Sequence, residues 1–350
     1  MVIDNRDSLN NVTYIIGAGA SATALPLASN LPRRLINLSG YLKDNEPEIS
    51  NEVFNREVIA NLRWLGEEAL KPEFQEVDTY AKDLYLHRKY DELARVKQTL
   101  STFFTIEQFI LEKSDPRYKN LLIRLMDNSH VFPENVKILN WNYDFQFEIA
   151  AEHFRQEKFS YGGGASQHSP PLIPYYPGLG YNDRNMQGDI SMVHLNGLAG
   201  FYYYEQTGHI LNYFLNGTLK TIDDLYERIQ QDSNHKHHLL IFGWERHTQA
   251  GELLKHRLSI ATKMIEETDI LVIIGYSFPE DNIETDTELF KVLNNVKRIY
   301  FQNPEMNGAF LTEQFSLDPA LEIVHETKTN KFLRPREISL KRTAKSLRIA

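Results

Sequence analysis

The sequence contains no cysteine among its 350 residues. This absence excludes disulfide bonds, thiol nucleophiles and every zinc site built from cysteine ligands. No apolar run approaches the roughly 20 residues that a helix needs to cross a bilayer, so we expect no membrane span. The first ten residues, MVIDNRDSLN, are polar and charged where a secretory signal would be apolar. We therefore expect a cytoplasmic protein.

Basic charge is scarce over most of the chain. The formal net charge is −9, and residues 331–350 hold seven Lys or Arg against one acid, which leaves about −15 for the remainder. An acidic body cannot neutralise many phosphates, so we do not expect it to bind nucleic acid. The basic C-terminal extension, 326–350, is expected to be solvated or docked on a partner, and contact with an anionic partner stays open.

The chain does contain short apolar segments separated by helical patterns. We predict strands at 12–16, 136–139, 191–195, 238–242, 270–274 and 297–301. Buried strands that alternate with helices predict an α/β fold, with a doubly wound, mostly parallel, Rossmann-like sheet. This domain is expected to span 1–325, interrupted at about 45–135 by a helical insertion in which helical spacing recurs without a strand candidate.

A glycine-rich turn, GAGAS at 17–21, follows the first predicted strand. Gly17 and Gly19 allow the backbone to turn sharply and to approach a pyrophosphate, and Ser21 adds a hydroxyl. Such turns also arise from packing alone, so the structural alternative stays open. The next segment, LPRRLINLSGYLKDNE, indicates a helix rather than the second strand with an acidic end that a dehydrogenase has, which argues against a redox enzyme.

Polar residues follow the other predicted strands as well. They are Asn142, Tyr143 and Asp144, then His194, then Gly275 and Ser277, and finally Asn303. Parallel strands present their carboxyl ends at one edge of a sheet, where ligands bind. Two structural alternatives stay open, because Asp144 could simply cap the following helix and His194 could be a structural histidine.

This ordered set of motifs, over roughly 12–305 without the insertion, resembles the SIR2 family and, within it, the bacterial SIR2-like proteins of antiphage defence. The resemblance implies NAD as the substrate and no metal. It implies catalytic roles for Asn142 at the nicotinamide ribose, for the bracing acid Asp144 and for His194. The residues that it implies for NAD binding are Gly17, Ala18, Gly19, Ser21, Tyr143, Gly275, Ser277 and Asn303.

Two departures from the family pattern bear on the chemistry. Asn140 and Trp141 stand where the family commonly has Thr and Gln, which puts the local ribose contacts in question. The four cysteines of the zinc ribbon in sirtuin deacylases are missing from this sequence. An acylated peptide therefore lacks the binding groove that the zinc module helps to form in those enzymes. The resemblance therefore implies hydrolysis of NAD to nicotinamide and ADP-ribose or its cyclic isomer. The alternatives are a non-catalytic NAD or ADP-ribose sensor and a zinc-free deacylase.

Unregulated hydrolysis of NAD would kill the host cell, so an NAD hydrolase requires an inactive state. The helical insertion, the Gly- and Pro-rich loop at 161–185 and the basic extension offer surfaces for such control. We therefore expect a homo-oligomer and a regulatory or activating protein partner.

Overall fold

The computed structural model describes ten stretches of the chain. They are residues 10–45, 52–126, 131–159, 172–177, 190–206, 209–212, 221–222, 224–225, 229 and 236–338. Most of the predicted loop at 161–185 and the end of the basic extension lie outside them. Within the described stretches, no helix is both long enough and apolar enough to cross a membrane.

The centre of the protein is a seven-stranded sheet in the order β10-β9-β8-β1-β2-β4-β3. Every pairing in it is parallel. Its strands are β1 (Val12–Ile16), β2 (Val136–Asn140), β3 (Tyr175–Tyr176), β4 (Met192–His194), β8 (Ile270–Ile274), β9 (Arg298–Gln302) and β10 (Glu322–Glu326). All five residues of β1 and of β8 are buried, as expected for central strands covered on both faces.

The strand order defines the fold class. Without the two-residue edge strand β3, the order is sixth, fifth, fourth, first, second and third along the chain, which is the Rossmann order. The chain adds β2 and β4 on one side of β1, and later β8, β9 and β10 on the other. The predicted doubly wound parallel sheet is confirmed. The direction in which successive strands are added to the sheet reverses at the boundary between β1 and β8. Ligands of such sheets bind outside the carboxyl ends of the strands at this reversal.

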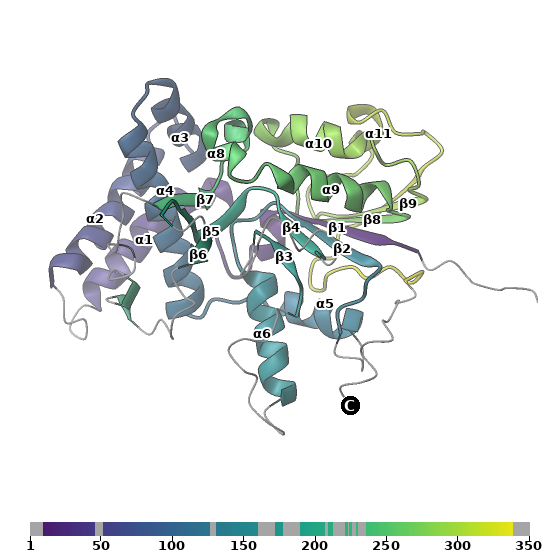
Figure 1. Cartoon of the computed structure of the whole chain (residues 1–350), viewed down its shortest axis with the longest axis horizontal. Helices are drawn as coiled ribbons and strands as arrows, with labels where there is room; N and C mark the ends of the chain where they lie inside the picture. Colours follow the sequence, from purple (N-terminus) through teal and green to yellow (C-terminus); the bar gives the residue numbers. More distant parts are fainter. Residues whose placement is uncertain are drawn as a thin grey trace, which may run out of the picture.

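Helices cover both faces of this sheet (Figure 1). On one face lie α9 (His256–Glu266), α10 (Ile283–Phe290) and α11 (Phe310–Gln314), and on the other lie α5 (Pro116–Met126) and α6 (Gln146–Phe159). Apolar side chains at helical spacing explain the docking of α5, since Leu121, Leu122 and Leu125 are fully buried in the main core.

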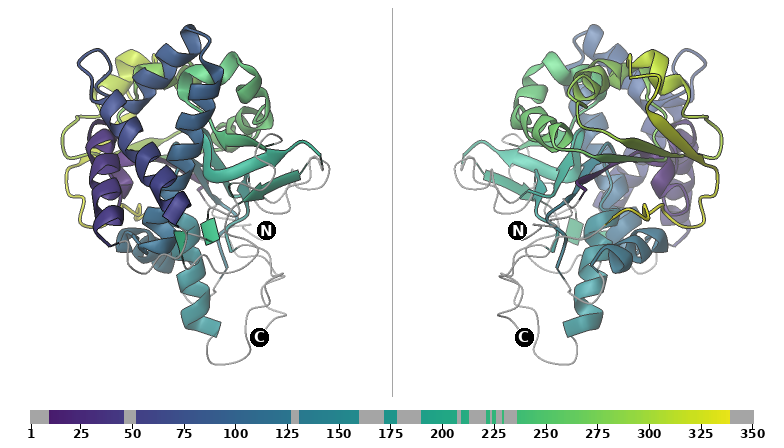
Figure 2. Two further views of the ribbon diagram at one scale, coloured as in Figure 1. Left: turned by 90° about the vertical axis from the view of Figure 1, so that its left-hand side faces the viewer. Right: turned by 90° about the vertical axis from the view of Figure 1, so that its right-hand side faces the viewer.

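A helical region lies beside the sheet, but its bounds are about 31–110 rather than the predicted 45–135, because α5 packs on the main sheet. It consists of α1 (Leu31–Asp44), α2 (Glu52–Ala69), α3 (Val77–Leu86) and α4 (Tyr90–Thr105), continued by a π-helical turn at Ile106–Ile110. These helices lie side by side in Figure 2 and form a second apolar core with Leu240 and Phe242. The insertion therefore packs against residues that lie more than 100 positions further along the chain.

A second, antiparallel sheet joins this helical region to the main sheet. Its order is β6 (His209–Asn212), β5 (Gly197–Tyr204) and β7 (Lys236–Leu240). The strand predicted at 238–242 is therefore two residues earlier and lies outside the parallel sheet, so its predicted place is wrong. An isolated apolar run indicates a strand but carries no information on which strand it will pair with.

The C-terminal part of the described chain returns to the main core. After β10, Phe332 is buried and its carbonyl oxygen accepts a bond of 2.6 Å from Arg124 Nη2 of α5. Gln302 Nε2 donates to the carbonyl oxygen of Lys331 at 2.7 Å, and Ile338 is also part of the core. The described part of the expected extension is thus packed against the sheet domain rather than solvated.

Candidate active site

The carboxyl ends of β1 and β2 meet through the side chain of Asn142. Its Nδ2 atom lies 3.1 Å from the carbonyl oxygen of Gly17 and 3.3 Å from Ser21 Oγ. The backbone amide of Asn142 donates to Asn140 Oδ1 at 3.1 Å, which holds the turn after β2. The predicted catalytic asparagine is therefore attached directly to the glycine-rich turn at 17–21.

His194 ends β4 and lies beside the same turn. Its Nδ1 atom is 3.5 Å from the backbone oxygen of Asn142, and its Nε2 atom is 2.6 Å from Glu148 Oε1 on α6. The His194 side chain is 0% exposed and that of Glu148 is 14% exposed. The second oxygen, Glu148 Oε2, is buried without a hydrogen-bond partner among the described residues. The sequence carried no signal for Glu148, because a glutamate in the first turn of a helix is common.

Asp144 is buried and accepts hydrogen bonds from two neighbouring residues. Its Oδ1 atom accepts a bond of 3.2 Å from the backbone amide of Gln146 at the start of α6, which is the capping role left open above. Its Oδ2 atom accepts a bond of 2.6 Å from Ser21 Oγ. Burial raises the pKa of Asp144 to about 6, and the hydrogen bond from Ser21 opposes this rise. The acid thus both starts α6 and connects it to the first turn.

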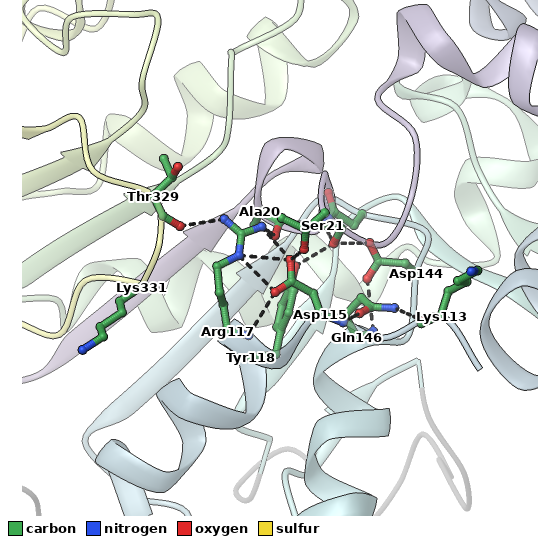
Figure 3. Close-up of polar contacts among 12 residues, drawn as sticks. Ala20, Ser21, Lys113, Asp115, Arg117, Tyr118, Asp144, Gln146, Thr329 and Lys331 are labelled. Atoms are coloured by element: carbon green, nitrogen blue, oxygen red, sulfur yellow. Dashed lines mark hydrogen bonds and ion pairs between the residues drawn. The ribbon is translucent and has the colours of Figure 1, made fainter. Parts of the chain in front are cut away.

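A polar network extends from this point toward α5 (Figure 3). Tyr118 places its hydroxyl 2.7 Å from Ser21 Oγ. Arg117 Nη2 lies 2.6 Å from Asp115 Oδ2 and 2.7 Å from the oxygen of Ala20, while its Nη1 reaches the oxygen of Thr329 at 2.8 Å.

The carboxyl of Asp115 is charged in this network. Burial alone would raise its pKa, but hydrogen bonds from Arg117 and Thr23 hold the pKa of Asp115 below its usual value. Arg117 therefore bonds three separate segments around an ionised carboxylate. No sequence motif marked Asp115, Arg117 or Tyr118, because their partners lie in distant parts of the chain.

Packing accounts for Gly17 and Gly275, the glycines that follow β1 and β8. A Cβ atom at Gly17 would lie 2.5 Å from Tyr276 Cα, and one at Gly275, where φ is +61°, would lie 2.2 Å from the amide nitrogen of Ala20. The amide of Gly19 donates to the oxygen of Gly275 at 2.9 Å. The two turns therefore contact each other backbone to backbone, which is the structural alternative for these glycines. Ala18, between Gly17 and Gly19, is exposed.

The other predicted binding residues are spread along the same edge of the sheet. Ser277 is exposed, and the preceding Tyr276 stacks on Trp141 with ring centroids 5.5 Å apart. Asn303 is buried, and its Oδ1 accepts the backbone amides of Glu305 at 2.9 Å and Met306 at 3.0 Å. Among the described residues, neither Ser277 nor Asn303 bonds to Asn142 or His194.

Tyr143 points toward the helical insertion instead of toward His194. Its ring contacts Phe104 of α4 at a centroid distance of 6.2 Å and Phe242 at 6.4 Å. Burial raises the pKa of Tyr143 well above its usual value, with further contributions from Asp78 and other nearby acids. Its phenol is therefore neutral at every physiological pH.

The potential metal ligands are scattered in the described part of the chain. No group of three or more His, Cys, Asp or Glu side chains is arranged there to hold a metal ion.

Fold and site together define a doubly wound α/β protein with a histidine–glutamate pair and a buried polar network at the carboxyl edge of its sheet. No protein-family model and no curated protein matches the sequence. Among solved structures, the chain is similar to Sir2Tm bound to a propionylated peptide, with 11% identity, a TM-score of 0.40, and coverage of 90% of this chain and 88% of that one. It is also similar to a sirtuin from a study of substrate affinity, with 12% identity, a TM-score of 0.40, and coverage of 92% and 91%. The strand order and the contacts described above, rather than these low scores, define the fold.

Proposed function

We propose that the protein is a SIR2-like NAD hydrolase that cleaves the bond between nicotinamide and ribose. The observation that carries this proposal is the pairing of His194 with Glu148 directly beside Asn142, at the edge of the sheet where the glycine-rich turn lies. This arrangement offers a general base with an orienting carboxylate, in contact with the backbone of the residue whose side-chain amide would hold a hydroxyl or a water molecule.

The chemistry needs a base more than an acid. Rupture of the bond sends its electron pair to the ring nitrogen of nicotinamide, which leaves as a neutral molecule, while the anomeric carbon gains oxocarbenium character. A water oxygen forms the new bond to that carbon and must lose a proton. A base in this position contributes about 10²- to 10⁴-fold in rate by general precedent.

The contacts of His194 select the nitrogen that accepts the proton. An ionised Glu148 can only accept a hydrogen bond, so Nε2 carries the hydrogen that it donates to Glu148 Oε1. Nδ1 then holds the lone pair. Because the carbonyl oxygen of Asn142, 3.5 Å away, can only accept a hydrogen bond, Nδ1 has to exchange this contact for one with water or a ribose hydroxyl before it takes the proton. The charge that develops on the ring is stabilised by Glu148.

We place the diphosphate of NAD at the turn of Gly17, Ala18 and Gly19, next to the loop of Gly275 and Ser277. Exposure of Ala18 and Ser277 favours this placement. The amide of Gly19 is already bonded to Gly275, so other donors of the two turns must hold the phosphates. Asn303 would lie near the adenosine half.

The test is to incubate the purified full chain with NAD and to measure nicotinamide and ADP-ribose by chromatography. Nicotinamide release without any acylated peptide is the expected result, and Asn142→Ala and His194→Ala should each abolish it. His153→Ala, at an exposed position of α6, is the matched control and should retain it. Unchanged turnover in either site variant would refute the proposed site, and turnover only with an acyl-lysine peptide would identify a deacylase.

The second candidate is an NAD or ADP-ribose sensor without catalysis. The complete burial of His194, with both ring nitrogens within 3.5 Å of protein oxygens, favours this candidate. It predicts that NAD binds in calorimetry while no nicotinamide is released over hours.

For the biological role, we propose a regulated effector of antiphage defence, as the motif resemblance implies, acting as a homo-oligomer with an activating partner. Light scattering of the full chain tests the oligomer. NAD turnover measured with and without the products of neighbouring reading frames tests the partner.

A further inference from the structure

Ser21 is the centre of a buried hydrogen-bond network with three polar neighbours. Its Oγ atom lies 2.6 Å from Asp144 Oδ2, 2.7 Å from the Tyr118 hydroxyl and 3.3 Å from Asn142 Nδ2. A serine hydroxyl has one hydrogen to donate and two lone pairs to accept with. These three contacts therefore use its full capacity.

The chemistry of the partners fixes the direction of each bond. The carbonyl oxygen of Gly17 can only accept, so the amide atom of Asn142 that faces it at 3.1 Å must be the nitrogen. The second hydrogen of that nitrogen is then directed to Ser21 Oγ. An ionised Asp144 can only accept, so Ser21 donates to Asp144 and its remaining lone pair accepts from Tyr118.

This directed network leaves one atom of the Asn142 side chain for a ligand. Both hydrogens of Nδ2 are engaged within the protein, while Oδ1 has no hydrogen-bond partner among the described residues, and Asn142 keeps 6% of its surface exposed. The carbonyl oxygen of the Asn142 side-chain amide is thus available as a hydrogen-bond acceptor, on the residue whose backbone oxygen lies 3.5 Å from His194 Nδ1.

We propose that Ser21 and Tyr118 are positioning residues that, with Asp144, lock the Asn142 amide so that its Oδ1 accepts a hydrogen bond from the attacking water or a ribose hydroxyl of the substrate. This inference rests on the proposed function and deepens it. It gives Ser21 a role different from the phosphate contact that its motif implies. It also adds to the site a residue of α5, Tyr118, that lies 97 positions from Ser21.

The lock depends on the ionised form of Asp144. Protonation would turn the acceptor into a donor and reverse the bond to Ser21, so the lock should fail as the pH falls through the pKa of Asp144, about 6. The charged groups near Asp144 are Glu148 and His194, with Asp115 and Arg117 beyond Tyr118. Because the bond from Ser21 lowers the pKa of Asp144, its loss in Ser21→Ala should raise the pKa of that carboxyl.

The experiment compares Ser21→Ala and Tyr118→Phe with the wild-type full chain in steady-state NAD hydrolysis. The matched control is Tyr14→Phe, which removes a buried hydroxyl that has no hydrogen-bond partner among the described residues. Misplacement of a positioned group lowers kcat, so we expect a loss of roughly 10- to 100-fold in both site variants. We expect KM for NAD to change less than about threefold, and Tyr14→Phe to match the wild type.

The outcomes separate this inference from the proposed function. If the wild type hydrolyses NAD and kcat is unchanged in both site variants, the positioning role is overturned and the proposed hydrolase activity stands. An effect of the variants on KM alone would lead to the same conclusion. If the wild type does not hydrolyse NAD, the proposed function fails, and the network is judged by carbon NMR titration of the Asp144 carboxyl. An upward shift of its pKa in Ser21→Ala then supports the network, and an unchanged titration overturns it.

Discussion

The Nε2 atom of His194, at the end of β4, lies 2.6 Å from Oε1 of Glu148, in the first turn of α6. The two residues are 46 positions apart, and they belong to β4 and to α6, a helix that covers one face of the main sheet (Figure 1). A buried imidazole with a carboxylate on one nitrogen has a fixed tautomer and orientation. This relationship defines the environment of His194 beyond its position at the end of a strand.

Removal of the charge on Glu148 should slow the proposed reaction. Glu148→Gln keeps an oxygen that can accept from Nε2 but no longer stabilises a positive ring, so we expect kcat for NAD to fall about 10- to 100-fold. Glu152→Gln, at an exposed position one turn further along α6, is the control. Steady-state kinetics measure both, and equal kcat values in the two variants would show that the carboxylate has no part in the reaction.

Asp286 should make the protein less stable as the pH rises. Burial raises the pKa of Asp286 to about 8, against an unfolded value of 3.8. The folded state therefore binds more protons than the unfolded state between these values, and stability falls as the pH rises through this window. Asp286→Asn removes this effect, so its gain in the free energy of unfolding should grow from near zero at pH 4 to roughly 3–6 kcal/mol at pH 8.

Urea unfolding at pH 4, 6 and 8 measures this gain. Tyr276 can still donate to the new amide oxygen as it does to Asp286 Oδ2 at 2.8 Å. Glu284→Gln, at an exposed position of the same helix, should show little change at any of the three pH values. A gain that is constant with pH would contradict the raised pKa.

Two glycines should respond in opposite directions to substitution by alanine. Gly275 has φ of +61° and no room for a Cβ atom, so Gly275→Ala should lose roughly 3 kcal/mol or more of stability. Gly40 lies inside α1 with no atom within 4 Å of a built Cβ, so Gly40→Ala should gain about 0.5–1 kcal/mol. Thermal unfolding of the two variants decides the matter, and a stable Gly275→Ala variant would mean that the turns are not in contact.

The ion pair between Arg117 and Asp115 should matter far more than an exposed pair. The Asp115 side chain is 0% exposed, so Arg117→Ala leaves a buried charge without its partner and should cost about 3–5 kcal/mol. The exposed pair of Arg63 and Glu67, at 2.7 Å on α2, should cost less than about 1 kcal/mol in Arg63→Ala. Chemical denaturation measures both, and similar losses in the two variants would argue against the cross-linking role of Arg117.

The sequence predicted the central strands of the main sheet better than its edge strand β10 or the irregular strand β5. The bounds of β1 and β8 agree with the prediction because five consecutive buried residues leave a clear apolar run. β10, with the sequence EIVHE, was not predicted because it lies at the edge of the sheet and its exposed and half-buried residues mix charge with apolar side chains. β5 was not predicted either, since it begins with Gly197 at positive φ and carries a bulge.

Short, local patterns of apolar residues, glycine and asparagine were enough to predict the class of the fold and the polar residues that follow the strands. The three-dimensional packing was needed to show that 236–240 joins an antiparallel sheet, that Glu148 pairs with His194, and that Tyr118 bonds to Ser21. Those contacts depend on how distant helices cross the sheet, and no local pattern encodes such crossings. The chemistry proposed for Asn142 thus depends on neighbours that a reading along the chain could not supply.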